Sequence, residues 1–150
     1  IDFPREGNGC SYHYCRRQWS LADNPELRYE QLQAFDSAML ALLKTGRLMR
    51  TLPYSQWEHR EDHVLIYSKG NTLFLFNFDP CRSFDNYFIP APVEGKYTVE
   101  LSSDDGRFGG HDRVDPGCRY RAVRQPDGRV GFFCYIPSRT AIVLKLRRKG

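Results

Sequence analysis

Four aspartates are the residues best suited to acid–base chemistry, and they lie close together among glycines: Asp104, Asp105, Asp112 and Asp115. Sugar chemistry that retains configuration needs two carboxyl groups about 5–5.5 Å apart in a cleft. Aspartates beside glycines more often accept hydrogen bonds from neighbouring backbone N–H groups and so hold a turn. We therefore expect turn-forming aspartates here, and the sequence assembles no catalytic site from them.

Serine and histidine suggest no hydrolase either. No Gly-x-Ser-x-Gly elbow occurs, so we interpret Ser138 as part of a turn that enters the last strand. His59 and His63 are four residues apart in a strand-like segment, which predicts that both lie on one face. Charged residues surround them, so the simpler interpretation is a solvated edge.

Cysteine gives no metal site. The five cysteines form no framework spacing, and only Cys10 and Cys15, on either side of His13, invite a metal interpretation. A tetrahedral metal site needs four converging ligands, and a matching second pair is missing. We expect no metal, no cofactor and free thiols in a reducing compartment, with Cys134 buried in a strand.

Aromatic rings in polar or proline-rich contexts could stack on the apolar face of a sugar. The alternative, which we favour, is that these rings cover the edge of a core or dock on another domain. The rings are Tyr54, Trp57, Tyr87 and Phe88.

Length and composition indicate one ordinary globular domain. The 150 residues are 41% hydrophobic and 27% charged, which argues against disorder and against a membrane protein. The net charge is only +4, and its densest run, Arg147–Lys149, is interpreted as a solvated tail rather than a nucleic-acid site. No signal peptide is visible at Ile1, and the apolar runs are of strand length, so we expect no membrane partner.

Two structural parts are expected. Residues 1–24 are irregular and aromatic, which suggests a segment packed inside a larger fold. A helix is predicted over about residues 25–44, with Asn24 as its N-cap and Gly46 as its C-cap. The apolar stripe of this helix is expected to be ordinary core and consists of Leu32, Phe35, Met39, Leu42 and Leu43.

The remainder of the chain has β-strand patterns. Phe74, Phe76 and Phe78 alternate with Leu73 and Leu75, which predicts a central strand that is covered on both faces. A second strand should direct Tyr97, Val99 and Leu101 inward. Strand follows strand without a helix, which predicts an antiparallel β-sandwich with strands at 64–67, 72–78, 96–101, 120–124, 130–136 and 140–146.

Short motifs from residue 1 to about residue 145 then suggest a family. They are Ile1–Arg5, Ser11–Tyr14, Arg16–Trp19, Asp23–Asn24, Leu27–Tyr29, Leu75–Phe78, Gly95–Tyr97, Phe108–His111 and Ile136–Ala141. In residue types, order and spacing the sequence resembles the 1,4-α-glucan (glycogen or starch) branching enzymes, in the eukaryotic-like branch of the α-amylase superfamily. It departs from the family at Cys10 and at Cys15, where Ala is usual.

The resemblance implies a position within a longer protein. Family members have an N-terminal β-sandwich, a central (β/α)₈ barrel and a C-terminal all-β domain. Residues 1–50 would then be the end of the catalytic barrel, including the helix at about 25–44, and residues 51–150 the C-terminal domain. The catalytic Asp and Glu of the family lie before the position of Ile1, so no catalytic residue is expected in this chain.

The resemblance also implies an activity. The whole enzyme would cleave an α-1,4 linkage and transfer the chain to a 6-hydroxyl, whereas this chain alone would be inactive and would stabilise the barrel. Its partners would be its own barrel and α-glucan (glycogen or amylose), and its location the cytoplasm. The candidates for glucan contact are Asp2, Arg5, Arg16 and Trp19.

Two alternatives stay open. The chain could be a stand-alone carbohydrate-binding or docking sandwich. It could also be the C-terminal domain of an α-amylase-type hydrolase, because the choice between transfer and hydrolysis is made by barrel loops.

Overall fold

The computed structural model describes residues 19–45 and 48–147. Within these residues one α-helix, α1 (Tyr29–Thr45), precedes a series of strands, and short 3₁₀ turns are η2 (Trp19–Leu21), η3 (Leu48–Arg50) and η4 (Gly106–Phe108). The strands are β1 (Tyr54–His59), β2 (Val64–Lys69), β3 (Thr72–Asn77), β4 (Phe84–Pro90), β5 (Gly95–Ser102), β6 (Arg119–Arg124), β7 (Val130–Ile136) and β8 (Thr140–Arg147).

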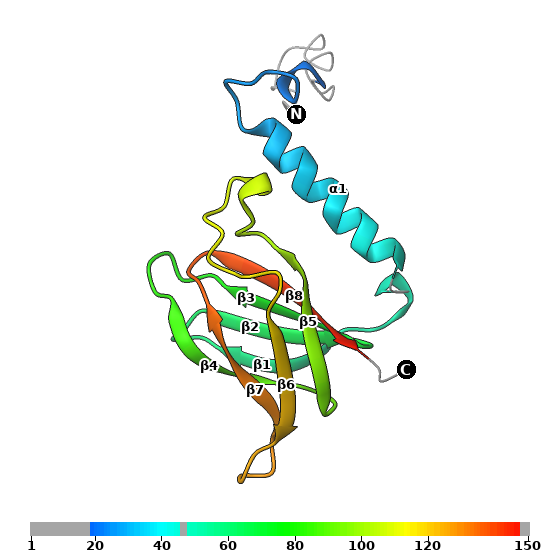
Figure 1. The fold of residues 1–150 in the computed structure, drawn as a ribbon, viewed down its shortest axis with the longest axis vertical. Coiled ribbons are helices and arrows are strands. Elements are labelled where there is room, and N and C mark those ends of the chain that lie inside the picture. Colours follow the sequence, from blue (N-terminus) through cyan, green and yellow to red (C-terminus); the bar gives the residue numbers. More distant parts are fainter. Residues whose placement is uncertain (1–18, 46–47, 148–150) are drawn as a thin grey trace, which may run out of the picture.

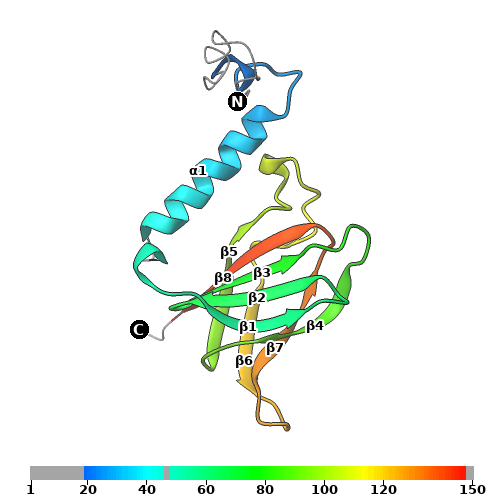
Figure 2. The same cartoon turned by 180° about the vertical axis from the view of Figure 1, so that it is seen from behind.

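All eight strands belong to one antiparallel sheet with the order β1-β2-β3-β8-β5-β6-β7-β4. The sheet curls so that its two halves face each other, as Figure 1 shows from one side and Figure 2 from the other. The predicted mainly β, antiparallel sandwich is therefore confirmed, and it is close to a closed barrel.

The main core lies between the two halves of the sheet. Leu73 and Leu75 of β3 face this core, where Tyr97 of β5 is almost wholly buried beside Phe132 of β7. Burial of such large apolar side chains is the principal favourable term in folding. The remaining buried members of this core are Val64, Ile66, Ile89, Ala91, Val114, Ala122, Cys134, Ile136, Ile142 and Leu144.

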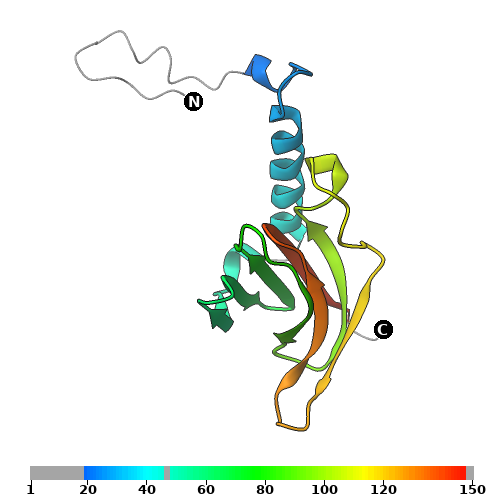
Figure 3. The ribbon, with the colours of Figure 1, turned by 90° about the vertical axis from the view of Figure 1, so that its left-hand side faces the viewer.

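A second, smaller core lies on the outer face of the sheet, beneath α1 (Figure 3). Phe74 and Phe76 of β3 belong to it, so both faces of β3 are covered, as predicted. Phe35 of α1 contacts the edge of the Phe108 ring in η4, with ring centroids 5.2 Å apart. Leu42 and Leu43 also pack here, so these parts of the predicted helix stripe are core.

The helix begins later than predicted, at Tyr29 instead of about residue 25. Asn24 does accept a hydrogen bond from the N–H of Glu26, but its carbonyl oxygen accepts from Leu27 and closes a separate turn. Asn24 therefore caps this turn, and it does not cap the first residue of α1. Gly46, the predicted C-cap, lies outside the described residues.

A β-bulge corrects the prediction for β5. The register shifts between Val99 and Leu101, which pair with Leu144 and Val143 of β8. Because a shift of one residue exchanges the two faces of a strand, Tyr97 and Val99 face the main core while Leu101 faces the core under α1. The predicted inward alternation was therefore wrong at Leu101.

Strand β4 was also missing from the prediction. Its sequence, FDNYFIP, has no regular alternation and its ladder with β7 contains an irregularity between Phe84 and Tyr87. Its pairing depends on a partner that lies more than 40 residues further along the chain, which a local pattern cannot reveal.

Candidate functional site

The residues predicted to contact glucan fall mostly outside the described part of the chain. Asp2, Arg5 and Arg16 are not described. Trp19 lies in η2 and exposes 62% of its surface. Because Trp19 is the one member of this set that the structure describes, the prediction stays untested.

The aspartate-rich turn after β5 is built around Asp104, which is almost completely buried. Its carboxylate accepts a hydrogen bond from the backbone N–H of Arg113 at 2.7 Å and a longer one from His111. The Arg113 guanidinium donates from Nη2 to Oδ1 at 2.7 Å and from Nε to both oxygens. A buried carboxylate of this kind is stable only while its charge is paired.

Arg113 extends this contact to the turn between β7 and β8. Its Nη2 donates to the carbonyl oxygen of Ser138 at 3.3 Å and its Nη1 lies 3.5 Å from the Ser138 hydroxyl. Burial raises the pKa of Asp104, but the hydrogen bonds and charge of Arg113 outweigh burial, so the pKa falls below its ordinary value. The ion pair therefore holds two distant turns together.

The aspartates of this region form turns, as predicted. Asp105 caps η4 by accepting from the Arg107 N–H, and Asp112 accepts from the Gly106 N–H at 2.7 Å. Asp115 likewise accepts from Gly117. Gly110 is required here because a Cβ at this position would lie 2.1 Å from the carbonyl oxygen of Asp104. Each carboxylate is thus engaged by its own loop, and Ser138 lies in the turn that enters β8, as predicted.

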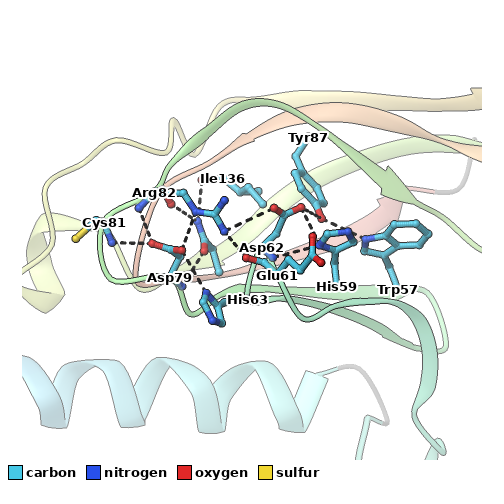
Figure 4. A network of polar contacts seen from close by, with 11 residues as sticks. Trp57, His59, Glu61, Asp62, His63, Asp79, Cys81, Arg82, Tyr87 and Ile136 are labelled. Carbon is cyan, nitrogen blue, oxygen red and sulfur yellow. Dashed lines mark hydrogen bonds and ion pairs between the residues drawn. The ribbon is translucent and has the colours of Figure 1, made fainter.

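A second polar network surrounds Arg82, on the loop between β3 and β4 (Figure 4). Asp79 is buried, and its Oδ1 accepts from the N–H groups of Cys81 and Arg82 at 2.9 and 2.7 Å. Its Oδ2 accepts from Arg82 Nε at 2.9 Å and lies 3.2 Å from His63 Nδ1. Buried Asn77 donates to the carbonyl oxygens of Arg82 and Ile136 and so joins the loop to β7.

These donors determine the charge state of Asp79. The backbone N–H groups of Arg82 and Cys81, followed by the Arg82 side chain, hold the pKa of Asp79 well below its ordinary value. Arg82 also donates to the carbonyl oxygen of Glu61 and lies 3.7 Å from Asp62. The loop is therefore anchored to the turn between β1 and β2.

Trp57 and Tyr87 complete this network. The indole N–H of Trp57 donates to the Tyr87 hydroxyl oxygen at 3.2 Å, and that hydroxyl donates to Asp62 at 3.1 Å. Both rings are partly buried against the main core. The interpretation that they cover a core edge is confirmed; Phe88 packs on Phe133, whereas Tyr54 is 71% exposed.

The prediction that His59 and His63 lie on one face of a strand was wrong. His59 is the last residue of β1, and residues 60–63 turn the chain, with His63 at a φ of 55°. The two side chains therefore contact different carboxylates. His59 Nδ1 lies 3.0 Å from the Asp62 carboxylate, and His63 contacts Asp79. The Arg82 network itself was not predicted, although Asp79-Pro80 after a strand is typical of a turn.

The cysteines and carboxylates give no sign of a metal centre in the residues that the structure describes. Cys81, Cys118 and Cys134 are free thiols, and burial raises the pKa of Cys134 to about 12. Cys134 is buried in β7, as predicted. Cys10 and Cys15, the cysteines around His13, lie outside this part of the chain.

Helix α1 and the segments on either side of it expose an apolar surface. Leu32 of α1 is 62% exposed and Met39 is 38% exposed, so the prediction of ordinary core was wrong at these two residues. The neighbouring Leu40 is 48% exposed. Exposed apolar side chains that gather on one element are typical of an interface. The other exposed members are Leu27, Tyr29, Met49 and Leu52.

Residues 54–147 match the family described as alpha amylase, C-terminal all-beta domain. The match runs from the first residue of β1 to the last residue of β8, so it covers the whole sheet. The chain belongs to this family. The curled sheet is thus the alpha-amylase C-terminal all-beta domain, and η2, α1 and η3 precede it.

Curated relatives match almost the entire chain. A protein of Rhizophagus irregularis named 1,4-alpha-glucan-branching enzyme is 43% identical over 96% of this chain, and that of Dictyostelium discoideum is 40% identical over 97%. The Saccharomyces cerevisiae protein of the same name is 38% identical over 98%. The chain spans only about a fifth of the length of these relatives, 21–22%. In the described residues, no helix is long and apolar enough to cross a membrane.

Proposed function

We propose that this chain is the C-terminal part of a 1,4-alpha-glucan-branching enzyme, which transfers α-1,4-glucan segments to 6-hydroxyl groups and forms α-1,6 branches. The observation that carries the proposal is the extent of the matches. Relatives with this name cover 95–99% of the chain at 38–43% identity, including residues before the all-beta domain. If the chain shared only its all-beta domain with these relatives, as the C-terminal domain of a hydrolase would, the match would not extend to the residues before the sheet.

Within such an enzyme the chain would be structural rather than catalytic. The carboxylates that could serve acid–base chemistry accept hydrogen bonds from their own loops or are paired with arginine, as Asp104 is with Arg113. We infer that residues 51–150 form the C-terminal domain and that residues 1–50 belong to the end of the barrel.

The partner of the exposed apolar surface would be the catalytic barrel of the same protein. Leu32 and Leu40 on α1, with Met49 and Leu52 beyond it, expose between 48% and 87% of their surface to solvent. Apolar area removed from water stabilises a contact by roughly 25 cal/mol per Å². Burial of these side chains against the barrel would therefore stabilise the active enzyme.

Glucan contact is a further part of the proposal. Trp19 is exposed and follows Arg16 by three residues, and with Asp2 and Arg5 it would contribute to the rim of the barrel. An exposed indole covers sugar C–H groups while charged neighbours bond the hydroxyls. The location would be the cytoplasm, and the free thiols of Cys81, Cys118 and Cys134 are usual for a reducing compartment.

The test compares the 150-residue chain with the whole natural protein that contains it. Both are incubated with amylose, and α-1,6 linkages are measured by debranching followed by chain-length analysis. We expect branches from the whole protein and none from the chain alone. Substitution of Trp19 by Ala in the whole protein should alter the transferred chain lengths; an unchanged distribution would remove Trp19 from the site.

A further inference from the structure

The outer face of β8, β5 and β6 carries an array of cations next to the area that α1 covers. Lys96 of β5 lies directly opposite Arg147 of β8 on one side and Arg121 of β6 on the other. Two residues along the strands, Thr98 lies between Lys145 and Arg119 in the same way. Tyr97 and Ala122 on the alternate positions are buried, so these cations lie on the outer face.

This arrangement has an energetic cost for the fold. Like charges directly opposite each other on adjacent strands are destabilising. Arg147 is relieved by Glu100, whose Oε1 lies 2.6 Å from its Nη2, and by a bond to the Thr98 hydroxyl. For Lys96, Arg119 and Arg121, the described residues provide no ion pair, although all three are exposed.

A groove of about 1190 Å³ runs along this array. Four of the cations line it, together with apolar residues such as Val93 and Val123. Glu94 at its rim is engaged by Arg124, with Nε and Oε1 3.7 Å apart. The groove is large enough for an organic ligand of several rings, and its cations leave it strongly positive.

We propose that this groove binds phosphate groups, with Lys96 and Arg121 as the main ligands. A guanidinium binds two phosphate oxygens through its planar fork, and an adjacent ammonium adds a point charge. A bound phosphate would also relieve the repulsion among the three strands. The phosphate can be free or esterified to a sugar, and only the glucan-borne source depends on the function proposed above.

The experiment measures binding to the 150-residue chain by isothermal titration calorimetry. The probes are inorganic phosphate, a maltooligosaccharide with a phosphate ester on one 6-hydroxyl, and the same oligosaccharide without phosphate. We expect the phosphorylated sugar to bind at least about tenfold more tightly than the neutral sugar, since each bond to a charged group contributes on this scale. If inorganic phosphate displaces the phosphorylated sugar, the groove binds phosphate from any source. If inorganic phosphate does not displace it, the groove requires the sugar phosphate ester.

Charge reversal at one position provides the matched test. Arg121→Glu should weaken binding of the phosphorylated sugar by about tenfold or more, while Arg60→Glu, at a side chain that is 92% exposed in the β1–β2 turn, should change it less than about twofold. Lys96→Glu should abolish binding of the phosphorylated sugar. It should also raise the unfolding temperature, because it removes the positive charge that lies between Arg121 and Arg147. A rise of this kind shows that the variant is folded.

Several results would overturn the proposal. These are equal binding of neutral and phosphorylated sugar, wild-type binding by Arg121→Glu, or tighter binding of a DNA duplex than of the phosphorylated sugar. Loss of binding in the whole natural protein, while the isolated chain binds, would also overturn it, because another domain would then cover the groove.

Discussion

The indole N–H of Trp57 and the hydroxyl oxygen of Tyr87, 3.2 Å apart, join the two strands at opposite ends of the sheet. Trp57 lies on β1 and Tyr87 on β4, which are first and last in the strand order and share no backbone ladder. Side chains therefore close the curled sheet where backbone hydrogen bonds do not. Asp62 accepts from the same Tyr87 hydroxyl and ties this closure to the Arg82 network.

Removal of the Tyr87 hydroxyl should therefore destabilise the domain. In Tyr87→Phe the Trp57 N–H loses its acceptor and Asp62 loses a donor, which should lower the free energy of unfolding by about 1–2 kcal/mol. Urea denaturation of the 150-residue chain measures this. Tyr54→Phe is the control because Tyr54, which lies on β1 with Trp57, is 71% exposed. Equal effects of the two substitutions would contradict a role for the Trp57–Tyr87 contact.

Arg113 should be the most sensitive arginine of the domain. Arg113→Met leaves the Asp104 carboxylate buried without its counter-charge and should cost about 2–3 kcal/mol of unfolding free energy. Arg113→Lys keeps the charge but loses the fork geometry, so we expect an intermediate loss. Arg60→Met at the exposed turn should lie within about 0.5 kcal/mol of wild type. A loss for Arg113→Met no larger than that control would refute the pairing.

The domain should lose stability in acid through Asp79 and Asp104. Both carboxyl groups have pKa values below the ordinary one, for Asp79 because of the N–H groups of Arg82 and Cys81. A lowered folded pKa adds stability that is complete above the unfolded value of about 3.9 and disappears as the pH falls toward the folded value. Unfolding free energy should therefore decline from about pH 5 downward.

Asp79→Asn is the variant for this pH dependence. It should be less stable than wild type at pH 7 and should show a shallower decline between about pH 5 and pH 2, because one titrating group is gone. Denaturation at each pH measures both quantities. The same substitution at the exposed Asp127, whose pKa is also lowered, by the Arg129 side chain, should have a much smaller effect at pH 7. A slope that Asp79→Asn leaves unchanged would exclude Asp79 as a source of acid lability.

The exposed apolar face of α1 should control association. Leu32→Ser with Leu40→Ser should reduce self-association of the 150-residue chain, measured by analytical ultracentrifugation, because it removes unpartnered apolar surface. In the whole protein the same pair should lower the temperature of half-inactivation by several degrees. Gln33→Ser, at an exposed polar position of α1, is the control for helix propensity. If the double leucine variant of the whole protein has the same temperature of half-inactivation as wild type, this face of α1 does not contact the barrel.

Local patterns in the sequence predicted much of this fold. The alternation of Phe74 and Phe76 with Leu73 and Leu75 identified a strand covered on both faces, and the Asp-Gly turns were recognised from their own residues. These features depend on neighbours within a few positions. Strand β4 and the bulge after Val99 depend on partners far along the chain, so no local pattern reported them.

The polar networks were harder to predict for the same reason. Asp104 was identified as a turn residue, but its partner Arg113 is nine residues away and Ser138 another 25. Arg82 follows Asp79 by three residues, but its other partners, the Glu61 carbonyl oxygen and Asp62, come from the turn between β1 and β2. The charges of Lys96, Arg121 and Arg147 are dispersed in sequence and become an array through strand order.

Our central proposal is that this chain is a non-catalytic part of a glucan-branching enzyme. Its most direct test is the count of new α-1,6 linkages formed in amylose by the whole natural protein and by the 150-residue chain at equal molar concentration. We expect branches from the whole protein and a linkage count equal to the buffer blank for the chain alone. Branch formation by the chain alone, or none by the whole protein, would contradict it.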